Sequence, residues 1–164
     1  MMATRRSLAL MSLAPLLAAC GFSASAIPEP LSAANNAADS MASRLPASLR
    51  AATFAATPFA DAEDINQVSA IGRLVSEQMA NRLVAAHGIR LTEIRMANAL
   101  IMDSQVRGEL VLSRAAREHA KIAGIDLFLL GTVSRVGPRS YVNARLVRFV
   151  DGSVIGATSF VVSG

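Results

Sequence analysis

The hydrophobic pattern at the C-terminal end most limits the folds that this chain can adopt. Residues 125–133, IDLFLLGTV, are nearly all apolar, as in a strand buried on both faces of a sheet. Residues 140–150 then alternate in polarity, and their apolar face would hold Val142, Ala144, Leu146 and Val150. Asp151-Gly152 is a strong hairpin signal before a last strand in SVIGATSFVV. The chain is therefore expected to build a sheet that ends in an antiparallel hairpin.

The clearest helix lies in the middle of the chain. Its apolar stripe recurs every three or four positions and contains Val68, Ile71, Val75, Met79, Leu83 and Ala86. Asp64 is expected to cap this helix, with Gln67 completing a box-like cap. Gly88 directly follows His87, which predicts that the helix ends there.

The remaining elements complete an interleaved order of helices and strands. They are a helix over residues 40–49, strands over 52–59 and 89–96, and a helix from the capping Ser113 to Gly124. Residues 95–112 stay ambiguous between a short helix and a loop with a hairpin. The order predicts an α/β (α+β) fold, a single two-layer domain with helices packed on a mixed sheet.

The N-terminal residues are typical of an export signal. Arg5 and Arg6 form a short positive region, and the apolar stretch over residues 8–19 is too short to span a bilayer comfortably. We therefore predict that residues 1–19 are a lipoprotein signal peptide. The paired arginines leave the general secretory and twin-arginine routes both open.

The only cysteine of the chain comes directly after this stretch. Leu17-Ala18-Ala19-Cys20 resembles the bacterial lipobox, in which the thiol receives a diacylglyceryl group and the new amine receives a fatty acid such as palmitate. Two or three acyl chains anchor a protein stably, where one would be marginal. The alternative is a free cysteine that is discarded with the signal. Gly21, where many inner-membrane lipoproteins carry Asp, favours the outer membrane of a Gram-negative bacterium. We predict lipid attachment at Cys20.

Composition separates a tether from a folded domain. Residues 20–38 are rich in Ala, Ser, Pro and Asn and predict a flexible tether behind the lipidated cysteine, so the domain would cover residues 39–164. Removing residues 1–19 takes two arginines and no acid, which lowers the net charge from +4 to +2. No basic stripe with interleaved aromatic residues is present, so nucleic acid is not expected as a partner.

Residues suited to catalysis are sparse. His87 and His119 lie in different predicted helices without metal-ligand spacing, and the serines lack a nucleophile-elbow setting. Asp61, Glu63 and Asp64 could chelate calcium, but a solvated acidic loop that caps a helix explains them better. We expect no catalytic site, no metal and no cofactor.

One strand face is a candidate interaction surface. Arg139, Tyr141, Asn143 and Arg145 share parity on the predicted strand over residues 140–150 and its start. Arg and Tyr are enriched at protein interfaces. A plain solvent face, or ion pairs with helix carboxylates, would give the same pattern.

Several motifs together resemble the FlgO-domain family of bacterial outer-membrane lipoproteins. They are Gly72-Arg73-Leu74, Leu112-Ser113-Arg114, Gly131-Thr132 and Tyr141-Val142-Asn143-Ala144-Arg145-Leu146. Their order and spacing carry the resemblance, which covers residues 45–160. It implies an outer-membrane component that supports the flagellum and motility where the flagellum crosses the envelope.

Three functions follow as hypotheses. The first is a structural or assembly factor of the flagellar envelope apparatus that binds other proteins or further copies of itself. The second is a tethered lipoprotein that regulates cell-wall synthesis, although a tether of this length reaches about 60 Å at most. The third is a subunit like those of the curli exporter, although no pair of long membrane strands is evident. The short tether and the missing pore strands favour the first.

Overall fold

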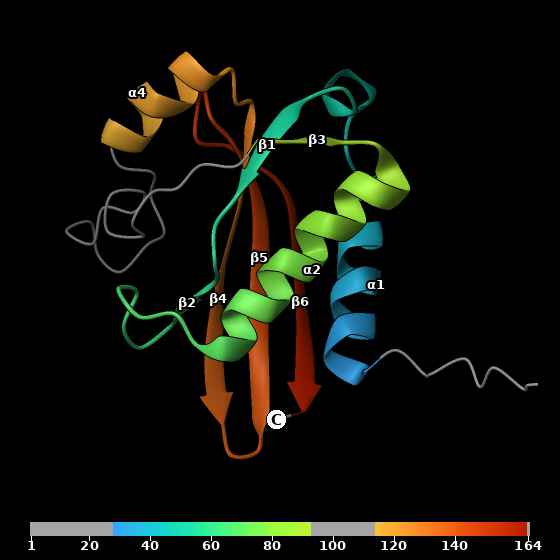
Figure 1. Ribbon diagram of the computed structural model, residues 1–164, viewed down its shortest axis with the longest axis vertical. Helices are drawn as coiled ribbons and strands as arrows, with labels where there is room; N and C mark the ends of the chain where they lie inside the picture. The colour runs from blue at the N-terminus through green and yellow to red at the C-terminus, as the bar shows by residue number, and fades with distance from the viewer. Residues whose placement is uncertain (1–27, 93–113, 164) are drawn as a thin grey trace, which may run out of the picture.

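The computed structural model describes residues 28–92 and 114–163 (Figure 1). The elements, in chain order, are α1 (Glu29–Ser43), the 3₁₀ turn η1 (Ala47–Leu49), β1 (Thr53–Ala56), β2 (Ala60–Asp61), α2 (Ala70–His87), β3 (Arg90–Leu91), α4 (Arg114–Ala123), β4 (Leu127–Val136), β5 (Arg139–Arg148) and β6 (Val154–Ser163). Cys20 and the predicted signal peptide lie outside the described residues, as do the whole segment 95–112 and the predicted cap Ser113.

The described strands form one mixed sheet in the order β3-β1-β4-β5-β6, with β2 pairing to β4 off this path. β1 runs parallel to β3 and β4, whereas β4, β5 and β6 are antiparallel neighbours. Gly137 and Gly152 adopt positive φ angles of 59° and 70° in the two C-terminal turns, a conformation that favours glycine. The predicted fold class and the C-terminal antiparallel hairpin are confirmed.

Helices α1 and α2 cover one face of the sheet (Figure 1). The main core lies between these two helices and the sheet, and it includes Phe54, Met79, Leu129, Val142 and Leu146. A smaller cluster on the opposite face joins Ala120 of α4 to strand residues of the other parity, among them Phe128, Leu130 and Val147. The helices therefore cover most of one face but reach only a smaller part of the other.

The first helix begins earlier than the sequence pattern predicts. It was expected over residues 40–49, but α1 begins at Glu29, so residues 29–38 of the predicted tether belong to the folded domain. Pro30 occupies the first turn, where a missing N–H costs nothing. Ala34, Ala37 and Ala38 are almost fully buried. Small alanines that pack closely give little hydrophobic signal, which is why this segment resembled a linker.

The N-cap predicted for α2 was wrong. The carboxylate of Asp64 accepts hydrogen bonds from the Asn66 backbone and the Gln67 side chain, which closes a turn ahead of the helix. Ser69 is the N-cap, and its hydroxyl accepts from the Gly72 N–H at 3.1 Å. The C-terminus is as predicted, because α2 ends at His87 and Gly88 adopts a φ of 65°.

Smaller differences concern the ends of elements. In the predicted stripe, Val75, Met79 and Leu83 are fully buried, but Val68 precedes α2 and Ala86 is exposed. The strand expected over residues 52–59 is shorter than predicted, because β1 covers only Thr53–Ala56, and β2 begins beyond that range at Ala60. Val150, predicted on the buried face of β5, is 81% exposed because the strand ends at Arg148.

Candidate functional site

The part of the sheet that α4 does not reach forms a continuous surface, which we call the open face. Strand pairing places three sets of neighbours across it: Val136–Arg139–Ser163, Ser134–Tyr141–Val161 and Thr132–Asn143–Ser159. Arg145 and its neighbour Ala157 continue the face on β5 and β6, beside Leu130, which is buried in the α4 cluster. All four residues that the sequence nominated are exposed on this face, and the residues between them on β5 are buried. The structure therefore brings Arg139, Tyr141, Asn143 and Arg145 together in one row.

The two arginines of the open face are unsatisfied. Among the described residues, neither the Arg139 nor the Arg145 side chain makes a hydrogen bond or an ion pair, which argues against the ion-pair interpretation of the pattern. The strand positions that flank them on the open face carry no acidic side chain. This surface is therefore positively charged and has guanidinium donors ready for carboxylate groups.

Apolar side chains lie between the two arginines. Tyr141 and its cross-strand neighbour Val161 are 40% and 39% exposed, and Val136 at the strand end is 62% exposed. Asn143 is held by Ser159, whose hydroxyl donates to Oδ1 at 2.7 Å. An apolar centre with a charged, hydrogen-bonding surround is the usual composition of a protein-binding surface.

A polar cluster joins the two helices on the opposite face. Arg82 of α2 donates two hydrogen bonds to the Asp39 carboxylate of α1, at 2.8 and 2.9 Å, and His87 Nε2 lies 2.8 Å from the same carboxylate. The Arg82 hydrogen bonds, followed by the His87 contact, lower the pKa of Asp39 from 3.8 to about 2. Sequence analysis placed His87 at the helix end but missed this link, because the partners are distant in sequence.

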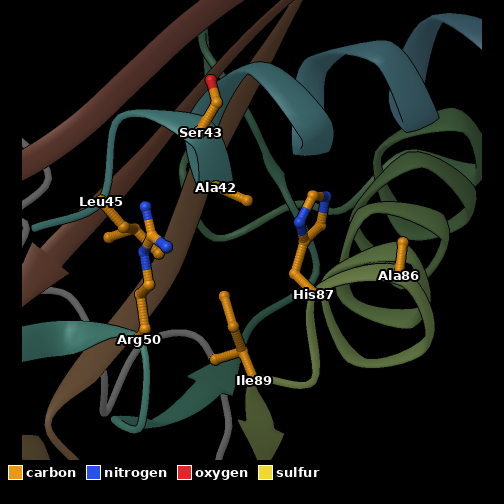
Figure 2. A pocket seen from close by; sticks show the side chains of 7 residues that line it. All are labelled: Ala42, Ser43, Leu45, Arg50, Ala86, His87 and Ile89. Carbon is orange, nitrogen blue, oxygen red and sulfur yellow. The ribbon is translucent and has the colours of Figure 1, made fainter. Parts of the chain in front are cut away.

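A pocket of about 310 Å³ lies beside this cluster, between the ends of the two helices (Figure 2). Figure 2 shows Arg50 and His87 on opposite sides of it, with Ile89 between them. Its other lining residues are Ala42, Ser43, Leu45 and Ala86. No sequence pattern indicates this pocket, because residues from separate elements line it. Its size is at the lower end for ligand pockets, and its only arginine is Arg50.

Residues 28–92 and 114–163 contain neither a cluster of metal ligands nor a helix that could span a membrane. In this part of the chain, no three His, Cys, Asp or Glu side chains gather as a metal site requires. Likewise, none of its helices is both long and apolar enough to cross a bilayer.

The fold and the open face define a small α/β domain with an exposed, cationic sheet face. The family model described as FlgO protein matches residues 35–164, and the chain belongs to this family. The resemblance seen in the sequence motifs is thus confirmed. No curated protein matches the chain.

Solved structures share the fold at low identity. The LpoB C-terminal domain from Escherichia coli is 19% identical, covers 80% of this chain and 98% of its own, and has a TM-score of 0.50. The same domain from Salmonella enterica is 17% identical with the same coverage and a TM-score of 0.49. The PelC dodecamer from Paraburkholderia phytofirmans is 17% identical over 73% of this chain and 77% of that chain, with a TM-score of 0.48. The similarity at a TM-score of 0.50 supports the fold and nothing finer.

Proposed function

We propose that this protein is an outer-membrane lipoprotein, acylated at Cys20, that supports the flagellum and motility by binding other envelope proteins. The observation that carries this proposal is the FlgO family match over most of the chain. The open face supports the mode of action, because it offers an exposed Tyr141 between two unpaired arginines and no catalytic grouping.

The position of α1 supports a role close to the membrane. Because the helix begins at Glu29, only the residues between Cys20 and Glu29 would connect the lipid to the domain. That length of chain spans about 30 Å when fully extended, roughly half of the reach expected from the sequence alone. An anchored domain with so short a tether would meet partners at the membrane surface. This favours a flagellar role in the envelope over reaching across the periplasm to regulate cell-wall synthesis.

The anchor and the function are tested together in a deletion strain. We expect poor swimming, with lost or fragile filaments in electron micrographs, and rescue by the wild-type gene. Cys20→Ser should fail to rescue and should appear in the soluble periplasmic fraction, because its acyl anchor is absent. Retention of Cys20→Ser in salt-washed membranes would contradict lipid attachment.

The binding surface is tested by charge reversal in the same strain. The double variant Arg139→Glu, Arg145→Glu should be membrane-bound and folded but unable to restore swimming, since it would repel an acidic partner. The matched control is Arg44→Glu, Arg73→Glu, which reverses two exposed arginines outside the open face. Equal rescue by both double variants would exclude the open face as the binding surface.

The same strain separates the hypotheses. Normal swimming together with altered cell-wall integrity would assign the protein to cell-wall regulation instead. A defect limited to export of a secreted substrate would favour the curli-exporter-like hypothesis.

A further inference from the structure

The last strand, β6, forms the long free edge of the described sheet. Its ten residues pair only with β5, whereas the opposite edge strand, β3, has two residues. No charged residue and no proline occurs in β6. Natural proteins usually protect long edges with charges, prolines or bulges, because an open edge recruits other strands.

One hydrogen bond identifies the backbone groups that point away from the sheet. The N–H of Ser163 donates to the Glu29 carboxylate at 2.9 Å rather than to β5. Backbone direction alternates along an antiparallel strand. The N–H and C=O groups of Ala157, Ser159 and Val161 therefore point outward as well.

Both ends of the β6 edge are blocked to an added strand, whereas its middle pairs with β5 without interruption. The register between β5 and β6 shifts at Leu146/Val147, which leaves Ile155 as an extra residue near the start of β6. At the other end, the Glu29 carboxylate accepts the hydrogen bond from the outward N–H of Ser163. Between them, residues 156–162 pair in continuous register with β5 and present an edge suited to one short added strand.

A second copy of this chain does not fit the edge. Helix α1 packs on β6, and α2 packs on β4, two strands further in. Two β6 strands paired about a two-fold axis would lie about 4.8 Å apart, which would bring the two α1 helices to nearly the same separation. Packed helices need about 8–10 Å between their axes. The edge therefore suits an extended segment that carries no helix above it.

The open face specifies the charge of that segment. Arg145 pairs with Ala157 and Arg139 pairs with Ser163, so only a small side chain separates each guanidinium from the free edge. An added strand would lie about 10 Å from β5. At that distance, an arginine side chain of β5 and a glutamate side chain of the added strand are long enough to meet. We propose that β6 accepts an extended, acidic segment of a partner protein as an additional strand. This inference rests on the proposed function only in that the partner is a protein.

The direct test uses a capped peptide of alternating valine and glutamate, about as long as β6, and the full chain in detergent micelles. With saturating peptide, the amide protons of Ala157, Ser159 and Val161 should exchange at least about tenfold more slowly by NMR. The inward amides of Thr158 and Phe160 should change little, because β5 already protects them. A peptide of alternating valine and lysine is the charge control and should give no protection.

A matched pair of variants isolates the backbone contact. Val161→Pro removes one outward N–H and leaves the ladder to β5 intact, a position where strands tolerate proline. It should weaken peptide binding by about tenfold or more. Val161→Thr retains the N–H and should bind within about twofold of wild type. Unchanged exchange at Thr158 and Phe160 would show that Val161→Pro is folded.

Three outcomes would overturn the inference. One is the absence of protection at the three outward amides, and another is equal binding by Val161→Pro and Val161→Thr. The third is a concentration-dependent dimer in sedimentation that Val161→Pro abolishes, because it would assign the edge to a second copy.

If Val161→Pro binds no peptide but restores swimming fully, a strand partner has no flagellar role and the proposed function still stands. If the deletion strain swims normally while the amides are protected, the edge site stands and the flagellar function fails.

Discussion

The two faces of β5 differ completely although one strand builds both. Val142, Ala144 and Leu146 point toward α1 and α2 and are at most 1% exposed. Between them, Tyr141, Asn143 and Arg145 point away from these helices and are exposed. Alternating residues of one strand thus serve two purposes: one set stabilises the domain, and the other is available to a partner.

The difference follows from how the helices are distributed over the two faces of the sheet. α1 and α2 cover most of one face, whereas α4 reaches only the cluster around Phe128 and Leu130. A sheet face that is covered contributes hydrophobic burial. An uncovered face contributes little and can change without loss of the fold. Substitutions on the two faces should therefore separate stability from function.

The largest expected effect is on the covered face. Leu146→Ala removes a core side chain that is 1% exposed and should lower the free energy of unfolding by about 3 kcal/mol. Its neighbour Arg145→Ala, on the open face, should change stability by less than about 0.5 kcal/mol. Urea denaturation followed by circular dichroism measures both. Similar losses for the two variants would mean that the faces are not distinct.

A smaller effect tests how closely the covered face is packed. A β-carbon at Gly131 would lie 2.7 Å from both the Phe59 ring and the Asn143 carbonyl oxygen. Gly131→Ala should therefore cost about 2 kcal/mol through overpacking. Gly156→Ala is the control, because the nearest atom to its β-carbon would be Met41 Cε at 4.0 Å. Thermal melts should show a clear drop in Tm for the first variant only; a neutral Gly131→Ala would contradict the close contact.

The smallest effect concerns the link between α1 and α2. Hydrogen bonds from Arg82 and His87 lower the pKa of Asp39 from 3.8 to about 2, so the unfolded chain binds this proton more readily. The stabilisation is therefore present above about pH 4 and is lost as the pH falls toward 2. Since the Asp39 side chain is 36% exposed, water screens the pair, and Asp39→Asn should cost at most about 1 kcal/mol at neutral pH.

Urea denaturation at about pH 6 and about pH 2.5 measures this dependence. The difference in stability between wild type and Asp39→Asn should shrink at the lower pH. Glu77→Gln is the control, because Glu77 is exposed on α2 and has no partner among the described residues. A constant difference at both pH values would exclude Asp39 as the titrating group.

Periodicity was most informative where the hydrophobic contrast is strong. The alternation along β5 correctly separated the buried residues from Arg139, Tyr141, Asn143 and Arg145. Gly88 and Gly124 correctly marked helix ends, and both adopt a φ of 65°. The start of α1 was missed because its buried residues are mostly alanines, whose small side chains give weak contrast.

By itself, the sequence determined the fold class, the C-terminal hairpin and the row of side chains on β5, because these follow from local periodicity and turn chemistry. Only the tertiary structure decided that α1 lies over β6, that Asp39 meets Arg82 and His87, and that β6 is a free edge. These features depend on contacts between segments far apart in the chain. The physical reason is that periodicity specifies which face of an element is buried, whereas packing geometry selects the element that buries it.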